Sequence, residues 1–563
     1  MSKHDGDGTP LNKESRESPT YHGTKLPGAS EKIKASAWIT LAILGSTILI
    51  TMYGETMLLP AIRDIISNFH ISYSTSSWIL TAYLISGAVS TPIAGKLSDI
   101  YGRKKMVVII LIIYIIGISA GGVSTNMAFL LTARVIQGIG ISMFPIAFGI
   151  IRDQLPKEKL AVGVGIFSSM FAAGSVVGLA VGGSIIQSFG WHATFLSIIP
   201  VAIILWVIIN RFIRGDNSIS EVVERDETSL QADANIKSGA DPTIAYADNS
   251  NGRKNLDVKG AITLAVTIAS FLLALTYVGN SSSVISGNSS VGAFTTQIII
   301  VLLALLSIGS LALFITIERR ASSPLIELSL IGDKILLPAN VIILIFGMTM
   351  FMVYQTIPIL VRSPHPFGFG GDAVASAMVQ LPFMIVFLIF APSSGFIVSK
   401  IGNLRPTAIG TVIMTIGFFS LFMFHSTESI VAMNLAIVAI GISLIQVGAF
   451  NITMEYTPRQ FSGVSLGMSV VLVLVGSSIG PTIAGLYMQT HQELAKEVSN
   501  IGKSGVGPFP SPISYDLIFL TAALISTISI ALVIMLKRKM TQSQSQSILK
   551  KLEIERAHEK HDV

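Results

Sequence analysis

The feature that most constrains this chain is a series of apolar runs, each long enough to cross the hydrocarbon core of a membrane. A membrane-spanning helix takes about 20 residues. The fourteen spans that we predict lie near residues 37–60, 76–98, 106–124, 126–150, 162–188, 194–213, 259–279, 294–317, 337–360, 374–399, 405–425, 429–452, 461–489 and 514–536. Backbone polar groups find no water in lipid, so only helices or closed barrels can span it. These runs are too long and too uniformly apolar for barrel strands, which predicts an all-α integral membrane protein.

The low content of charged residues and the lack of cysteine exclude several other classes of protein. Only 12% of the 563 residues are charged, whereas roughly 25% are charged in an ordinary soluble protein. There is no cysteine, which excludes a disulfide framework and a thiolate metal site. A net charge of +6 would suggest a nucleic-acid partner for a soluble protein, but the positions of the basic residues give a better explanation.

Those positions predict how the chain crosses the membrane. With the N-terminus inside, the 38 Lys and Arg residues lie on the inner side with few exceptions. The exceptions are Arg63, Arg362, Lys496 and Lys503 in outer loops and Arg134 within a span. Because basic residues favour the cytoplasmic side, we expect both termini to be cytoplasmic. Nothing in the sequence resembles an organelle-targeting signal, so we expect the protein to lie in the cell membrane. The positive charge then reflects topology and implies no nucleic-acid partner.

Polar segments between the spans divide the chain into six regions. We predict a cytoplasmic N-terminal tail (1–36), a six-helix bundle (37–213), a polar cytoplasmic linker (214–258), two additional helices (259–317), a second six-helix bundle (318–536) and a cytoplasmic C-terminal tail (537–563). The linker is rich in Asp, Asn, Ser and Glu, a composition typical of disorder. The C-terminal tail is predicted to be flexible, with a possible short amphipathic helix at 548–556.

An internal repeat supports the two-bundle arrangement, because the chain matches itself at an offset of about 300 residues. The matching glycines are Gly95 with Gly395, Gly102 with Gly402, Gly174 with Gly476, Gly178 with Gly480, and Gly183 with Gly485. Each match pairs spans of like orientation. Six helices, two additional helices and six more form a transporter layout, with the substrate path between the repeats.

The sharpest local motif lies between the second and third spans. It reads Gly95-Lys-Leu97-Ser-Asp99-Ile-Tyr-Gly102-Arg103-Lys104. A carboxylate at the end of one helix can meet the N-terminus of a neighbouring helix or a basic side chain. The motif therefore predicts a conformational latch at Gly95, Asp99, Gly102, Arg103 and Lys104. The alternative is an ordinary positively charged loop with a turn glycine.

This motif resembles the signature loop of the major facilitator superfamily, G-x-L-x-D-x-x-G-R-K. Three further segments add to the resemblance. Arg134-Val-Ile-Gln137-Gly138-Ile-Gly140 is similar to the family's R-x-x-Q-G-x-G segment, and the exporter-type helix motif Gly174, Gly178, Gly182, Gly183 is similar to the signature of its exporters. Trp78-Ile-Leu-Thr-Ala-Tyr83 resembles the start of the second helix in its fourteen-helix drug:proton antiporters. The resemblance implies the major-facilitator-type fold of two six-helix bundles, and export of small amphipathic molecules. It covers the chain from about 37 to 537.

Two positions depart from the family's pattern. The exporter motif usually has proline after its second glycine, where this chain has Leu179, and the proline occurs in the repeat copy as Pro481. Relatives also carry an aspartate in the first span at the position of Thr51, which cannot titrate usefully. The first departure weakens the inference about export direction. The second means that a proton site in the first span must be a residue other than Thr51.

Glu55 and Arg134 are the candidate proton-coupling residues. Glu55 lies one helical turn beyond Thr51, on the same face of the first span. A carboxylate within the bilayer is costly and indicates a functional site, and burial favours its protonated form. Arg134 stays charged, so it needs a carboxylate, backbone carbonyls or a wet cavity. A Glu55–Arg134 pair that changes with protonation is one interpretation, and purely structural roles for both residues are the other.

Uncharged polar residues within the spans form a weaker set of candidates. Those that could hydrogen-bond a substrate in a central cavity are Gln137, Tyr354, Gln355, Gln380, Gln446 and Asn451. They could equally join helices to one another. The Met and Phe residues suit an adaptable apolar pocket, although lipid-facing Phe is also expected, so no single aromatic is chosen.

Together these features predict a secondary active transporter and not an enzyme. We expect a monomer without a cofactor, driven by the proton gradient, that exports amphipathic compounds (cations among them) by alternating access. Protonation of Glu55 would release the substrate outward. The alternatives are a proton-coupled transporter of one specific metabolite, and a nutrient sensor, which usually needs larger tails than these. Neither an ATP-binding loop nor a catalytic or metal-binding constellation is evident in the sequence.

Overall fold

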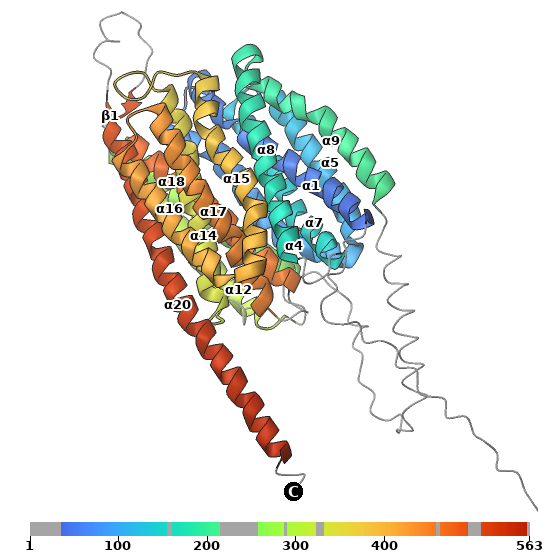
Figure 1. The fold of residues 1–563 in the computed structure, drawn as a ribbon. Coiled ribbons are helices and arrows are strands. Elements are labelled where there is room, and N and C mark those ends of the chain that lie inside the picture. Colours follow the sequence, from blue (N-terminus) through green and yellow to red (C-terminus); the bar gives the residue numbers. More distant parts are fainter. Residues whose placement is uncertain are drawn as a thin grey trace, which may run out of the picture.

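A computed structural model describes residues 35–154, 160–213, 257–286, 290–321, 332–457, 462–493 and 508–559. Nearly all of these residues are helical (Figure 1). The predicted linker (214–258) falls almost wholly outside the described residues, and so does the N-terminal tail before residue 35.

The N-terminal half forms the first bundle. Its elements are α1 (Ala35–Thr56), η1 (Leu59–Ala61), α2 (Ile62–Phe69), α3 (Tyr73–Ser76), α4 (Trp78–Tyr101), α5 (Arg103–Gly122), α6 (Met127–Gly138), η2 (Ile139–Ser142), α7 (Met143–Gln154), α8 (Leu160–Phe189) and α9 (His192–Phe212). The fourth predicted span (126–150) is therefore α6 and α7, joined by the short 3-10 turn η2.

The C-terminal half comprises the two additional helices and the second bundle. Its elements are α11 (Val258–Ser286), α12 (Ser290–Glu318), α14 (Leu336–Arg362), α15 (Ala373–Ile401), α16 (Leu404–Met423), α17 (Glu428–Tyr456), α18 (Ser462–Thr490), β1 (Gln492–Glu493), β2 (Phe509–Pro510) and α20 (Pro512–Glu559). β1 and β2 pair as a small antiparallel hairpin.

The number of spans agrees with the sequence prediction. Within the described ranges, 13 helical segments are long and apolar enough to cross a membrane. α11 is a continuous helix whose apolar stretch, Lys259–Leu275, is shorter. Adding α11 to the 13 segments gives the fourteen predicted spans, and the all-α membrane fold class is confirmed.

The two bundles lie side by side, the first blue to teal and the second yellow to orange in Figure 1. α8 of the first bundle packs along α15 of the second, and α4 packs along α18. α11 contacts both α4 and α18 and so covers the seam between the bundles, and α12 packs on α11. α12 is the most exposed span, with 17% of its apolar window buried.

The spans alternate in direction and give the molecule two ends. We name the end that carries β1 and β2 the hairpin end, and the opposite end, where α1 begins and α9 ends, the tail end. α20 continues past the other helices at the tail end (Figure 1). The C-terminal tail predicted to be flexible is thus helical to Glu559, because after Pro512 this segment contains neither Gly nor Pro to interrupt a helix.

Candidate functional site

A cavity of about 60 Å³ lies between the two bundles at mid-depth. Its wall is mainly apolar, with the aromatic side chains Phe144, Phe171, Phe346, Phe351 and Phe450. The polar side chains among its lining residues are Thr51, Glu55, Gln446 and Ser477. Sites for drug-sized ligands usually enclose about 300–1,000 Å³, so a ligand of that size requires the bundles or their side chains to move apart.

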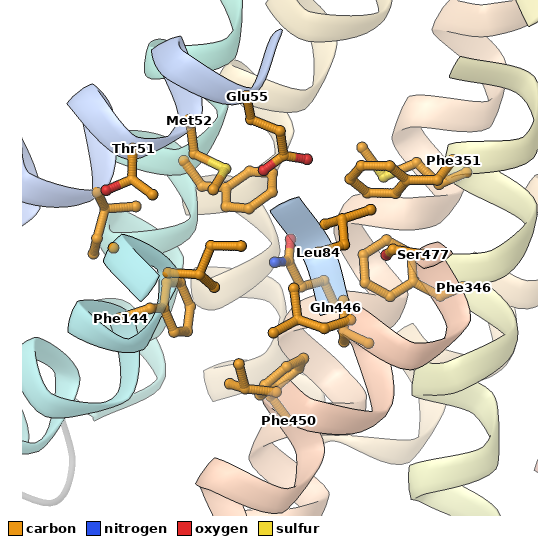
Figure 2. A pocket seen from close by; sticks show the side chains of 18 residues that line it. Thr51, Met52, Glu55, Leu84, Phe144, Phe346, Phe351, Gln446, Phe450 and Ser477 are labelled. Carbon is orange, nitrogen blue, oxygen red and sulfur yellow. The ribbon is translucent and has the colours of Figure 1, made fainter. Parts of the chain in front are cut away.

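Glu55 is the one ionisable residue in the cavity wall described by the structure. Its side chain is 3% exposed, and its carboxylate points into the cavity, toward the space that Gln446 enters from the other bundle (Figure 2). Within the described part of the chain, no hydrogen bond or salt bridge to this carboxylate is formed. A buried carboxylate without a partner is costly in its charged form, so it is suited to taking up either a proton or a cationic guest.

The helix that carries Glu55 is held by side chains from three neighbouring helices. Three carbonyls of α1 accept hydrogen bonds in addition to their place in the helix. The pairs are Tyr114 Oη with Ile50 O at 2.8 Å, Tyr83 Oη with Thr51 O at 3.2 Å, and Arg134 Nη1 with Gly54 O at 2.9 Å. These bonds come from α5, α4 and α6. They fix the last turns of α1 and therefore the position of the Glu55 side chain.

Arg134 forms the centre of this support. It is fully buried and donates to the carbonyls of Ile79 and Gly54 and to Gln137 Oε1, each at 2.9 Å. Its guanidinium carbon lies 4.4 Å from the centre of the Tyr83 ring, a cation–π contact. The structure thus shows the Arg134 guanidinium hydrogen-bonded to backbone carbonyls. One of these carbonyls belongs to Gly54, the residue before Glu55. An ion pair that alternates with protonation stays a prediction.

A salt bridge joins the bundles at the hairpin end. Arg362, at the end of α14, contacts the Asp64 carboxylate of α2 with both terminal nitrogens, at 2.8 and 2.9 Å, and donates to Pro60 O at 2.6 Å. The adjacent Arg63 lies over the Phe509 ring of β2, with its guanidinium carbon 5.4 Å from the ring centre. Sequence reasoning assigned Arg63 and Arg362 to outer loops without finding these partners, because residues far apart in sequence give no local signal of contact.

The architecture has clear counterparts among known proteins. The family model of the Major Facilitator Superfamily matches residues 44–481. The chain belongs to that superfamily. The resemblance seen in its sequence motifs is therefore confirmed, and the chain is a membrane transporter rather than an enzyme.

Relatives within the superfamily include two proteins of Bacillus subtilis (strain 168). The "Multidrug transporter protein MdtP" is 28% identical over 74% of this chain and 69% of that protein. "Multidrug resistance protein 3" is 26% identical over 78% of this chain and 77% of that protein. The crystal structure of the human organic anion transporter MFSD10 (TETRAN) aligns with a TM-score of 0.59 at 12% identity, over 89% of this chain and all of that one, which supports the fold alone.

The superfamily's signature loop forms the tight connection between α4 and α5. Gly102 has φ +92°, a conformation that favours glycine, and Gly402 repeats it between α15 and α16 with φ +82°. Lys104 Nζ donates to Asn210 O at 3.1 Å, at the end of α9. The Asp99 side chain lies outside the described residues, and a Cβ on Gly95 would meet open space. The latch assigned to this loop stays a prediction.

The glycines of the exporter-type motif allow close approach of α8 to two other helices. A Cβ on Gly174 would collide with Leu49 O, and one on Gly178 with Thr56 Oγ1, both on α1. Gly182 likewise faces Met57 at the end of α1. Gly183 faces the second bundle, where a Cβ would lie 2.9 Å from Ala377 Cβ of α15. The motif therefore packs α8 both within its own bundle and across the seam.

The uncharged polar residues that were candidates for the substrate cavity lie in different places in the structure. Gln446 lines the central cavity and its Oε1 has no hydrogen-bond partner among the described residues. Gln137 instead accepts from Arg134, and Asn451 donates to Val447 O within its own helix at 2.7 Å. Tyr354 and Gln380 line a second, smaller cavity inside the C-terminal bundle.

Ser477 is a cavity residue that sequence reasoning missed. It is fully buried on α18, and its hydroxyl has no hydrogen-bond partner among the described residues. The available signal was its position beside Gly476, within the repeat copy of the exporter-type motif. A small hydroxyl is a weak signal by itself, because serine is common in membrane helices.

Proposed function

We propose that this transporter exports amphipathic cations in exchange for protons, and that the two compete for the Glu55 carboxylate. The observation that carries the proposal is the Glu55 carboxylate, which has no hydrogen-bond or salt-bridge partner among the described residues and points into an aromatic cavity between the two bundles. Aromatic faces attract cations, and a carboxylate supplies the opposite charge. The relatives named for multidrug transport support the same reading.

Exchange follows from the requirement that the cavity stay close to neutral. A deprotonated Glu55 is stabilised by a bound cation, whereas a protonated Glu55 is neutral and does not attract one. Binding of a proton therefore weakens binding of the cation. We take the hairpin end to be outer, in accord with the predicted excess of basic residues on the opposite side. Protonation from outside then releases the cation there, and loss of the proton inside restores the site.

Transport into proteoliposomes under an imposed pH gradient tests this proposal. Wild-type uptake of tetraphenylphosphonium should follow the gradient and collapse when an ionophore dissipates it. Glu55→Gln keeps the size of the side chain but removes its titration, and should abolish the dependence on the gradient. Glu428→Gln, at the start of α17 and outside the cavity, is the matched control and should behave as wild type. Uptake by Glu55→Gln that still follows the gradient would contradict the proposal.

The small cavity favours a second candidate, a proton-coupled transporter of one specific metabolite. A volume of about 60 Å³ is better matched to a compact solute than to a drug-sized one. Competition experiments discriminate between the two, because a multidrug exporter is inhibited by many unrelated cations, and a metabolite transporter by one compound and its analogues.

A further inference from the structure

The interiors of the two bundles correspond residue by residue around one crossing of helices. A Cβ on Gly117 of α5 would collide with the backbone of Gln137 of α6, and a Cβ on Gly417 of α16 would meet the backbone of Val438 of α17. A Cβ on Gly140 likewise contacts the Tyr114 ring, and one on Gly441 contacts Met414. These contacts establish an offset of 300 to 301 residues for this part of the repeat.

At the place equivalent to Arg134, the second bundle has no long polar side chain. The offset pairs Arg134 with Leu435, Gln137 with Val438 and Tyr83 with Phe383. Leu435, Val438 and Phe383 all line the second cavity, which has a volume of about 10 Å³. The space that a guanidinium fills in the first bundle is therefore partly vacant in the second, with room for about one water-sized group.

Gln380 makes this vacancy a polar one. It lines the second cavity and is 1% exposed, and neither Nε2 nor Oε1 has a hydrogen-bond partner among the described residues. A buried amide without partners destabilises the fold, whereas an apolar side chain of the same length would not. The remaining wall is apolar or aromatic, with the Tyr354 and Phe383 ring centres 6.2 Å apart.

The second cavity and the central cavity share one lining residue. Met350 of α14 lines both cavities. Methionine is unbranched and changes rotamer readily. Rotation of Met350 would connect the two spaces, so that a group projecting from a molecule in the central cavity could reach the Gln380 amide.

We propose that Gln380 forms a hydrogen-bonding subsite for one hydroxyl or carbonyl group of the transported compound. The inference rests on the proposed function and adds to it a preferred substrate class, amphipathic cations that carry one neutral hydrogen-bonding group. Glu55 in the first bundle binds the charge, and Gln380 in the second binds the neutral group. The volume of the second cavity, about 10 Å³, limits the polar atom that enters it to about the size of a water molecule.

Two phosphonium cations of equal shape test the subsite by equilibrium binding to the purified protein. One is (4-hydroxymethylphenyl)triphenylphosphonium, and the other is (4-ethylphenyl)triphenylphosphonium, in which a methyl replaces the hydroxyl. Wild type should bind the hydroxymethyl compound about fivefold more tightly, in line with one net hydrogen bond. Gln380→Met should bind both equally, with the affinity for the ethyl compound changed less than about twofold.

The matched control is Gln355→Met. Like Gln380 of α15, Gln355 of α14 is a fully buried amide without a partner among the described residues, but it lines neither the central nor the second cavity. This variant should keep the preference for the hydroxymethyl compound. The thermal stability of Gln380→Met should equal or exceed that of wild type, because no bond is lost.

Several results would overturn the subsite. They are equal binding of both compounds by wild type, an unchanged preference in Gln380→Met, or a lower melting temperature of that variant, which would show that the amide binds a structural water. Each of these leaves the proposed function intact as long as Glu55→Gln weakens binding of both compounds. Failure of wild type to bind either cation would overturn the proposed function, and the subsite with it.

Discussion

The two bundles have the same helical framework, and their interiors differ in charge and in hydrogen bonding. Around the crossing of α5 and α6, the first bundle buries Arg134 with three hydrogen bonds and an aromatic contact. Around the crossing of α16 and α17, the second bundle has Leu435 and Val438 beside a cavity, and the Gln380 amide there has no hydrogen-bond partner in the described part of the chain. Arg134 Nη2 has no hydrogen-bond partner among the described residues, but the three hydrogen bonds of Nε and Nη1, two of which tie α6 to α4 and α1, resist rearrangement. The wall of the second cavity is mainly apolar and can adapt more easily. The comparison indicates a more rigid first bundle and a more adaptable second one, and under the proposed function these would bind the proton and the neutral part of the substrate.

The largest effect that this comparison predicts is on stability at Arg134. Arg134→Met removes three buried hydrogen bonds, to Ile79 O, Gly54 O and Gln137 Oε1. We expect a loss of at least about 3 kcal/mol in the free energy of unfolding, seen as a large fall in melting temperature or in folded yield. The equivalent change in the second bundle, Leu435→Met, conserves volume and should cost less than about 1.5 kcal/mol. Similar costs at the two positions would contradict the difference between the interiors.

A smaller effect concerns the salt bridge that joins the bundles. Arg362 and Asp64 are partly exposed, with 14% and 35% of their side chains accessible, so the pair contributes about 1 kcal/mol. Asp64→Asn should therefore raise the population open at the hairpin end about fivefold. Because the chain has no cysteine, Met52→Cys places a single thiol in the cavity wall, and its labelling rate by a membrane-impermeant maleimide measures opening.

The double change Asp64→Arg with Arg362→Asp is the control for that experiment. It restores an ion pair but loses the contact with Pro60 O, so the labelling rate should return only part of the way. A labelling rate in Asp64→Asn equal to that of the single-cysteine parent would show that the pair does not hold the bundles together.

The smallest predicted effect concerns the hydroxyl of Tyr83, whose contribution can be tested apart from that of the ring. Tyr83→Phe keeps the ring against Arg134 and removes the hydrogen bond to Thr51 O. The expected loss in thermal stability corresponds to about 1 kcal/mol. Tyr101→Phe, whose side chain is 59% exposed, should cost nothing measurable. If Tyr83→Phe is also neutral, the hydroxyl does not help to fix α1.

Much of the architecture could be predicted from the sequence because lipid imposes it. Long apolar runs must be helices, so the fourteen spans, the repeat and the family follow from local patterns. Glu55 was also predictable, since a charge inside a span is conspicuous. The orientation of side chains was not. Arg134 binds the carbonyls of Ile79 and Gly54, and a carbonyl acceptor leaves no trace in the sequence.

The uncharged residues show the same limit. Gln137, Gln380 and Gln446 look alike in sequence, yet one supports Arg134, one lines the second cavity and one lines the central cavity. Their roles depend on which way each helix faces and on the side chains beside them. Gln380, for example, lies beside a cavity because Leu435 stands where the first bundle has Arg134. Contacts between residues about 300 positions apart, such as Asp64 with Arg362, likewise come from tertiary packing alone.

Proton release on binding tests the central claim most directly. Tetraphenylphosphonium is added to the purified protein in weakly buffered solution, and the pH change is compared with the amount of cation bound. If cation and proton compete for Glu55, wild type should release up to about one proton for each cation bound, at a pH where the empty site is protonated. Glu55→Gln should release none. Proton release by Glu55→Gln equal to that of wild type, or cation binding by wild type without release at any pH, would contradict the account.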